Sequence, residues 1–313
     1  MNEITSLFGI RTLSCETISI GHINRTYLVK DENGEKFILQ SLSRKVFENP
    51  EIVMGNIAVA DKAFRDNEVL RIPDFLRCGE QLFADVNGEI WRMYRYIPSA
   101  ECENKVYSTG FSFGNFIKTM NGLKISEKPS IAGFHNYGSY LRKLLSYGNE
   151  YKGVDDLSKL GETLLNVFTD DIPKRIIHGD AKTDNVITGN PCTVIDLDTV
   201  MYSYTAVDYG DMLRSVCRKS FDVDAVSELT KGFADGIGGL LTYAEKDSLY
   251  YGVLWVTGEL AVRYITDAVS QEHYFYGKSA SECIERADEL LDMLKVFSDK
   301  KEEIQNIIWQ CFD

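Results

Sequence analysis

Alternating apolar and polar positions dominate the first hundred residues, a pattern typical of strands that face a core on one side. Residues 16–42 predict two or three strands, separated by the turn sequences GHIN and DENGEK. Further strands are expected within 70–76 and 81–97, where VNGE has the composition of a hairpin turn. One helix is predicted over 50–65, because Pro50 suits a first turn and apolar residues follow at helical spacing.

After Pro98 the apolar residues recur at helical spacing. Helices are expected within residues 113–123, 134–148, 156–169, 208–220, 226–241, 250–269 and 281–297. Two short strands around 186–196 interrupt this series. The pattern therefore predicts an α+β protein with a small antiparallel-sheet N-terminal lobe and a larger helical C-terminal lobe. We place the boundary between residues 97 and 98, which gives domains 1–97 and 98–313.

The composition of the 313 residues, 44% hydrophobic and 26% charged, is that of an ordinary globular protein. A net charge of −13 argues against a nucleic-acid-binding surface, which would show a basic stripe. The seven cysteines contain no CxxC pair, which favours a reducing compartment over disulfides or zinc. No apolar stretch approaches the roughly 18 residues of a membrane span, and the first residues lack the features of a signal peptide. We therefore expect a soluble cytoplasmic protein without nucleic-acid or membrane partners.

The densest polar cluster is HGDAKTDN, residues 178–185, which lies between two pairs of β-branched aliphatic residues. These pairs predict a tight loop with buried ends, from which Asp180 and Asn185 can converge on one pocket. The next strand ends in VIDLDT, and the alternation of side chains predicts Asp196 and Asp198 on the same face. A plain turn or helix cap is the structural alternative for such an aspartate-rich loop.

The residue types in this cluster suit phosphoryl transfer. Asparagine and aspartate oxygens are hard ligands that suit Mg²⁺ bound jointly with phosphate oxygens and water. Asp180 would orient an attacking hydroxyl group and accept its proton, while Lys182 would neutralise the transferring phosphoryl group. Catalysis of this reaction is mostly positioning and charge stabilisation, which such a set can supply.

The sequence HGDAKTDN…VIDLDT resembles the catalytic and metal-binding loops of the aminoglycoside phosphotransferase and choline kinase superfamily, a branch of the protein-kinase-like fold. The resemblance implies a two-lobed fold, with Asp180 as the catalytic base and Lys182 as a contact to the γ-phosphate. It also implies ATP and Mg²⁺ as cofactors, with Asn185 and Asp196 as metal ligands. Asp208 matches the aspartate that braces the catalytic loop in that superfamily, and an N-terminal helix cap is the alternative.

Other segments, among them GHINRTYLV, FILQSLSRKVFENPEIVMGNIAVA and ELAVRYITDAVSQEHYF, look like the N-acetylhexosamine 1-kinase group. GHIN would then cover the nucleotide, with Gly21, His22 and Asn24 as contacts. Gln40 stands where protein kinases place the lysine of V-A-I-K and joins the predicted nucleotide-binding residues. A neutral amide cannot pair with a helix glutamate, and the alternative for Gln40 is a solvent-facing strand residue.

The same resemblance implies that Arg263 and Tyr274 contact the sugar. Arg263 is expected to reach a cleft or an acid because burying an unpaired arginine is costly, and a salt bridge with Glu259 or Asp267 is the competing explanation. Asp198 would add a contact to a sugar hydroxyl or assist the metal.

These observations predict an ATP- and Mg²⁺-dependent small-molecule kinase. The resemblance to the N-acetylhexosamine 1-kinase group implies that its acceptor is the anomeric hydroxyl of an N-acetylhexosamine, an amino sugar. HGDAKTDN differs from the H-N-D-T-K-x-N-N that is usual in the hexosamine kinase group and is closer to the antibiotic and choline kinases. An aminoglycoside, choline or homoserine-like alcohol kinase is therefore the alternative, and a regulatory pseudokinase is a further one.

Overall fold

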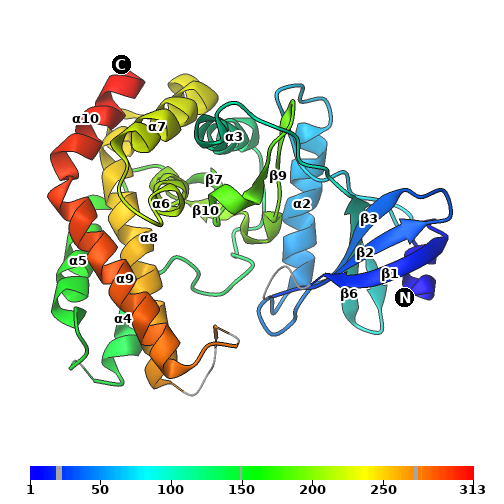
Figure 1. The fold of residues 1–313 in the computed structure, drawn as a ribbon, viewed down its shortest axis with the longest axis horizontal. Helices are drawn as coiled ribbons and strands as arrows, with labels where there is room; N and C mark the ends of the chain where they lie inside the picture. Colours follow the sequence, from blue (N-terminus) through cyan, green and yellow to red (C-terminus); the bar gives the residue numbers. More distant parts are fainter. Residues whose placement is uncertain (19–22, 149, 271–273, 276) are drawn as a thin grey trace. The chain divides into compact units, whose positions relative to one another are not determined.

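The computed structural model describes residues 1–18, 23–148, 150–270, 274–275 and 277–313 (Figure 1). The chain divides into two compact units. Unit 1 comprises Met1–Cys102, Gly122–Ala132 and Val186–Met201, and unit 2 comprises Glu103–Asn121, Gly133–Asn185 and Tyr202–Asp313. The domain boundary between residues 97 and 98 stays a prediction.

Unit 1 is built on a five-stranded antiparallel sheet with strand order β1-β2-β3-β6-β5. Its strands are β1 (Thr12–Ile18), β2 (Arg25–Asp31), β3 (Lys36–Ser41), β5 (Ala84–Val86) and β6 (Glu89–Arg95). Asn87 and Gly88, both with positive φ, form the tight turn between β5 and β6. Alternate strand residues enter a core that contains Val29, Leu39 and Met93.

Unit 1 also contains helix α2 (Pro50–Phe64), which begins at the predicted proline. A short helix, α1 (Asn2–Ser6), precedes the sheet, and β4 (Leu70–Arg71), β9 (Cys192–Val194) and β8 (Val186–Ile187) form a second, three-stranded sheet. Asn56, in the middle of α2, donates to the Val200 carbonyl at 2.9 Å and accepts from the Ser126 N–H at 3.1 Å. One buried carboxamide therefore connects three separate segments of unit 1.

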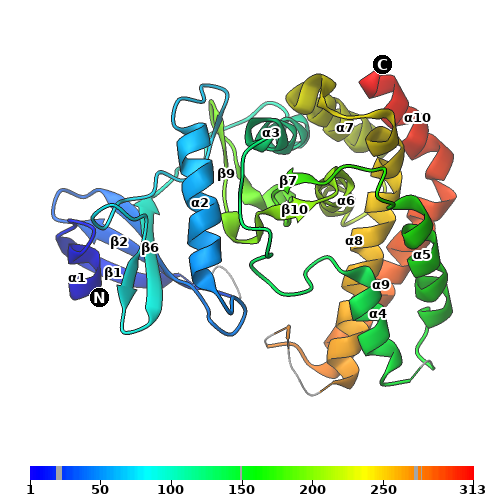
Figure 2. The same cartoon turned by 180° about the vertical axis from the view of Figure 1, so that it is seen from behind.

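Unit 2 is mainly helical (Figures 1 and 2). Its helices are α3 (Lys105–Met120), α4 (Tyr137–Leu145), α5 (Val154–Val167), α6 (Thr205–Val216), α7 (Val223–Ile237), α8 (Tyr243–Val269), α9 (Ala280–Asp299) and α10 (Lys301–Phe312). Helix α3 lies beside α7, and the long helix α8 packs against α4, α5, α6 and α9. Short 3-10 turns are η1 (Thr183–Asn185) and η3 (Gly238–Leu240) in unit 2 and η2 (Leu197–Thr199) in unit 1, and β10 (Met201–Ser203) begins at the division between the units.

Glycines allow two helix pairs of unit 2 to pack backbone against backbone. A Cβ atom on Gly252 of α8 would overlap the backbone of Ala206 in α6. A Cβ atom on Gly232 of α7 would likewise overlap the backbone of Tyr107 in α3. The close approach of α6 to α8 depends on the missing side chain of Gly252, and α6 carries Asp208.

A buried ion pair anchors strand β7 (Arg175–Ile177), which leads directly into residues 178–185. The guanidinium group of Arg175 donates to both carboxylate oxygens of Glu245, at 2.6 and 2.8 Å. Glu245 lies in the first turn of α8 and also closes a capping box with Thr242. A bidentate pair of this kind fixes both distance and orientation, so the strand that delivers the loop is tied to the longest helix.

The predicted α+β fold class is confirmed: an antiparallel N-terminal sheet is followed by a larger helical part. Within the described ranges, no helix has the length and apolar character that crossing a membrane requires.

Candidate active site

Residues 178–185, which we call the 178–185 loop, leave β7 and close into a tight turn. The Lys182 N–H donates to the Asp180 carbonyl, and the Asn185 N–H donates to the Lys182 carbonyl, each at 2.9 Å. Gly179 has a φ of 82°, a conformation that favours glycine. Local hydrogen bonds therefore give the loop its shape.

Asp208 holds the start of this loop. Its two carboxylate oxygens accept the N–H groups of His178 and Gly179, at 2.7 and 2.8 Å. Burial raises the pKa of Asp208 to about 7, although these two donors act in the opposite direction. Asp208 makes no side-chain cap for helix α6, whose N-cap residue is Tyr204. The brace is therefore the correct interpretation of Asp208, and the helix cap is wrong.

Asp180, Lys182 and Asn185 form one hydrogen-bonded group. Oδ2 of Asp180 accepts from Lys182 Nζ at 2.6 Å and from Asn185 Nδ2 at 2.9 Å. The side chains of Asp180 and Lys182 remain 28% and 36% exposed. Burial acts to raise the pKa of Asp180, but the Lys182 ammonium, His178 and the Asn185 amide hold this pKa below its ordinary value. Asp180 is therefore an ionised, partly accessible carboxylate at neutral pH.

In unit 1, the segment after β9 differs from the prediction. Strand β9 ends at Val194, Asp196 has a left-handed backbone with φ 63°, and residues 197–199 form a 3-10 turn. Asp196 is exposed whereas Asp198 is buried. The prediction that both aspartates share one face of a strand is wrong, because the left-handed residue ends the alternation between them.

The buried carboxylate of Asp198 is bound by two residues of unit 1. Oδ1 forms an ion pair with Arg92 Nη1, and Oδ2 accepts from Asn24 Nδ2 at 2.7 Å. Asp198 is only 3% exposed, so burial and these two partners restrict its access to a substrate.

Gln40 and Arg92 face each other across strands β3 and β6. Arg92 Nε donates to Gln40 Oε1 at 2.9 Å, and Gln40 Nε2 donates to the Thr26 hydroxyl at 3.2 Å. Both ends of the amide are thus engaged, and Gln40 is half-buried. Sequence reasoning missed Arg92, because only the register of β3 against β6 brings it opposite Gln40 and no local motif marks it.

The predicted metal ligands have suitable chemistry for Mg²⁺. Asn185 uses its Nδ2 atom on Asp180, which leaves the amide oxygen as its ligand atom. Asp196 presents an exposed carboxylate. Both are hard oxygen donors, so the residues fit the ion. The described parts of the chain contain no cluster of three or more His, Cys, Asp or Glu side chains, and Mg²⁺ held largely by phosphate and water needs none.

Arg263 of α8 lies among aromatic rings of unit 2, and its side chain is only 14% exposed. Its guanidinium carbon lies 4.8–5.7 Å from the ring centres of Phe134, Tyr140, Tyr274 and Phe275. The structure therefore brings the two predicted sugar contacts, Arg263 and Tyr274, together.

Carboxylates support this arrangement around Arg263. Asp267 accepts the backbone N–H groups of Tyr274 and Phe275, at 2.6 and 3.0 Å. Glu259 lies 4.0 Å from Arg263, so the expected ion pair exists at the limit of such contacts. Burial acts to lower the pKa of Arg263, but Tyr274, Tyr140, Glu259 and Asp180 raise it overall, and the guanidinium stays charged.

Two predicted nucleotide contacts, Gly21 and His22, lie outside the described residues. The third, Asn24, accepts the Ser43 N–H at 3.1 Å through its amide oxygen, in addition to its bond to Asp198. Asn24, the last residue of the predicted GHIN turn, is thus tied to the rest of unit 1.

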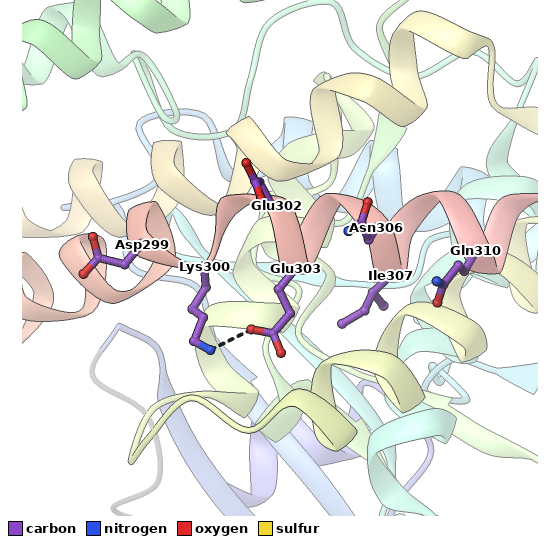
Figure 3. A pocket seen from close by; sticks show the side chains of 7 residues that line it. All are labelled: Asp299, Lys300, Glu302, Glu303, Asn306, Ile307 and Gln310. Atoms are coloured by element: carbon purple, nitrogen blue, oxygen red, sulfur yellow. Dashed lines mark hydrogen bonds and ion pairs between the residues drawn. The ribbon is translucent and has the colours of Figure 1, made fainter.

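A surface groove of about 520 Å³ lies along the end of α9 and along α10 (Figure 3). Its lining residues are Asp299, Lys300, Glu302, Glu303, Asn306, Ile307 and Gln310. Lys300 pairs with Glu303 at 2.7 Å, and no predicted site residue lines the groove. This groove therefore does not belong to the predicted site.

A family model described as the phosphotransferase enzyme family (APH) matches residues 14–243. The chain belongs to this family. In this phosphotransferase, the match includes the 178–185 loop, Asp196 and Asp208, but it ends before Arg263 and Tyr274. Family membership thus covers the residues predicted for phosphoryl transfer and leaves the predicted acceptor contacts outside.

Solved structures share the fold of this phosphotransferase along most of its length. A spectinomycin phosphotransferase in complex with ADP and spectinomycin matches with a TM-score of 0.66 and 13% identity, over 95% of this chain and 97% of that one. A choline/ethanolamine kinase family protein from Mesorhizobium loti matches with a TM-score of 0.63 and 16% identity, over 94% of this chain and 92% of that one. A microcompartment-associated aminopropanol kinase matches with a TM-score of 0.63 and 14% identity, over 92% of this chain and 93% of that one. At these identities the likeness establishes the fold alone.

Proposed function

We propose that this phosphotransferase is an ATP-dependent kinase that transfers the γ-phosphoryl group to a hydroxyl group of a sugar, the anomeric hydroxyl of an N-acetylhexosamine. The observation that carries the reaction type is the Asp180 group. An ionised, partly exposed carboxylate is held by Lys182 and Asn185 on a loop that Asp208 braces. Such a carboxylate can orient a hydroxyl group and receive its proton.

The chemical step follows from these groups. The acceptor oxygen forms a bond to the γ-phosphorus, the bond from that phosphorus to the β–γ bridging oxygen breaks, and ADP leaves. The hydroxyl proton passes to Asp180, whose low pKa makes it a weak base that acts late and mainly positions the oxygen. Lys182 lies beside Asp180 and offsets phosphate charge. Asn185 and Asp196 would hold Mg²⁺, which supplies further charge neutralisation when bound.

The nucleotide contacts are proposed in unit 1. Gly21, His22 and Asn24 would cover the phosphates, and Gln40 would lie beside the nucleotide. The charged partner of Gln40 is Arg92 on the opposite strand, whose own counter-ion is Asp198. The Arg92–Asp198 pair would then act on the segment that carries Asp196 and not on the substrate directly.

The surroundings of Arg263 support a neutral acceptor with oxygen atoms over a cationic one. The aromatic faces that would attract a substrate cation already face the guanidinium group. A guanidinium donates five N–H groups, which suit the amide carbonyl and hydroxyl groups of an N-acetylated sugar. Tyr274 is 48% exposed and offers a ring surface for the apolar face of the sugar.

A cationic alcohol is the second candidate acceptor, as for an aminoglycoside, choline or homoserine-like alcohol kinase. It requires Arg263 to move: four aromatic rings surround the guanidinium group in this structure, and without it they would form a cage for an ammonium group. Solved relatives of similar fold include an aminopropanol kinase and a choline/ethanolamine kinase family protein.

A panel of acceptor alcohols, followed by coupled detection of ADP, tests the proposal. We expect the highest kcat/KM with N-acetylglucosamine or N-acetylgalactosamine, and a phosphorus NMR signal of a sugar 1-phosphate. Arg263→Leu should lower kcat/KM for the sugar by about 10²-fold or more, because a polar group would lose its partner. Arg142→Leu, which removes an exposed arginine of unit 2, is the matched control and should leave kcat/KM unchanged. A larger kcat/KM for choline, ethanolamine or an aminoglycoside would refute the sugar assignment.

A further inference from the structure

His135 is a buried histidine that contacts both the 178–185 loop and helix α8. Its Nε2 atom lies 2.7 Å from the carbonyl oxygen of Gly179, and its Nδ1 atom lies 3.2 Å from Oε1 of Glu259. The His135 side chain is only 8% exposed, and its backbone has a φ of 53°. Nothing in the predicted chemistry of the site uses this residue.

Both ring nitrogens of His135 face oxygen atoms that can only accept hydrogen bonds. The Gly179 carbonyl requires an N–H on Nε2, and the Glu259 carboxylate lies against Nδ1 as an ion-pair contact and not as a well-directed hydrogen bond. A neutral imidazole has a single N–H, so it would leave one of these buried oxygens against a bare nitrogen lone pair. The doubly protonated imidazolium alone suits both neighbours.

The contact with Gly179 completes a clamp on the residue before Asp180. Asp208 accepts the N–H of Gly179 at 2.8 Å, and His135 donates to its carbonyl. Glycine has the least intrinsic backbone stiffness of any residue. Bonds on both sides of Gly179 therefore fix the direction in which the chain enters Asp180.

We propose that the His135 imidazolium is a positioning residue for phosphoryl transfer, which holds the Gly179 carbonyl and so aligns Asp180. The proposal rests on the proposed function, in which Asp180 orients the acceptor hydroxyl. Glu259 is the counter-ion that keeps His135 charged. Because Glu259 also lies 4.0 Å from Arg263, one buried carboxylate serves both the loop and the predicted acceptor contact.

The charged groups around His135 set the pH at which the clamp is lost. Glu259 of α8 and Asp211 and Asp208 of α6 favour the imidazolium, while Arg263, which lies near the same oxygen of Glu259, disfavours it. Burial acts to lower the pKa of His135, but Glu259 and the Gly179 carbonyl outweigh this effect and raise it. The stabilisation is therefore complete below the unfolded pKa of about 6.5 and disappears as the pH rises through the higher folded pKa.

NMR of ¹³C-labelled histidine provides a direct test in the full-length protein, because the chain has only four histidines. His135→Gln identifies the His135 signal. We expect the His135 signal to titrate above pH 6.5, and Glu259→Gln to move this midpoint to lower pH. A wild-type midpoint at or below about 6.5 would overturn the imidazolium.

Kinetics test the positioning role separately. In His135→Gln, kcat should fall by about 10- to 100-fold, as for a slight misplacement of a catalytic group, while KM for ATP and for the acceptor changes by less than about threefold. In the wild type, kcat should decline at alkaline pH as the His135 imidazolium loses its proton. This decline should be absent in His135→Gln and should lie at lower pH in Glu259→Gln. A purely structural role would lower the melting temperature without moving this decline.

Trp255→Phe is the matched control. It removes another donor to Glu259, at 3.0 Å, and leaves both contacts of His135 in place. Its kcat should stay within about threefold of wild type, and the His135 midpoint should be unchanged or higher, since Glu259 loses a competing partner. If the wild type is active and His135→Gln keeps its kcat and pH profile, the positioning role of His135 is overturned and the proposed function is not. A wild type that phosphorylates no acceptor overturns the proposed function, and this inference with it.

Discussion

Removal of the Arg92 guanidinium group is expected to destabilise unit 1 strongly. The side chains of Arg92 and Asp198 are 3% and 4% exposed, so Arg92→Met leaves a carboxylate buried without its cation. Breaking a buried pair from one side costs about 3–5 kcal/mol of the free energy of unfolding. Asp198→Asn removes the stranded charge while keeping a side chain of the same shape. The double variant should therefore be more stable than Arg92→Met, with a coupling energy of about 2 kcal/mol between the two positions.

Urea unfolding of the wild type, the two single variants and the double variant measures this coupling. The matched control is Arg25→Met, which breaks an exposed pair with Glu89 on the same sheet. Exposed pairs contribute little, so this control should cost less than about 1 kcal/mol. If Arg92→Met cost no more than Arg25→Met, or if the effects of Arg92→Met and Asp198→Asn were additive, the buried pair would not have the role described for it.

Three further predictions concern the loop and its support. Asp208→Asn keeps one acceptor oxygen but loses the other, so we expect calorimetry to show a free energy of unfolding that is lower by about 1–3 kcal/mol. A wild-type melting curve would contradict the role of Asp208 as a brace. Lys182→Met removes the main group that lowers the pKa of Asp180, so the acidic limb of kcat/KM should move to higher pH; an unmoved limb would show that Lys182 does not set this pKa. Gly252→Ala adds a Cβ atom that overlaps the Ala206 backbone and should lower the free energy of unfolding by about 1–3 kcal/mol. A wild-type thermal unfolding curve would show that α6 and α8 do not depend on this close contact.

The sequence predicted best the elements that have a long, regular pattern. The helix expected over 50–65 is α2 (Pro50–Phe64), and the one expected over 281–297 lies within α9 (Ala280–Asp299). Helix α1 has five residues, too few to show a helical period. Helix α10 follows α9 after Lys300 without an intervening glycine or proline, so no breaker separates the two in the sequence.

The residues of the candidate site that could be predicted lie close together in the sequence, whereas those that were missed have partners far away in it. The 178–185 loop could be found because its polar residues lie within eight positions and hydrogen-bond mainly to one another. Arg92 could not, because its partner Gln40 is brought opposite by strand register, 52 residues away. His135 is a single histidine in a loop, and its two acceptors come from distant segments, so neither residue type nor spacing marks it.

The most direct test of the central claim is the turnover of Asp180→Asn with its best acceptor, measured beside calorimetric binding of ATP in the presence of Mg²⁺. The variant keeps the shape of the side chain and loses the carboxylate that accepts the hydroxyl proton. We expect kcat to fall by about 10³-fold or more, the scale of a lost general base, while the Kd for ATP stays within about threefold of wild type. Retained turnover in Asp180→Asn would contradict the account.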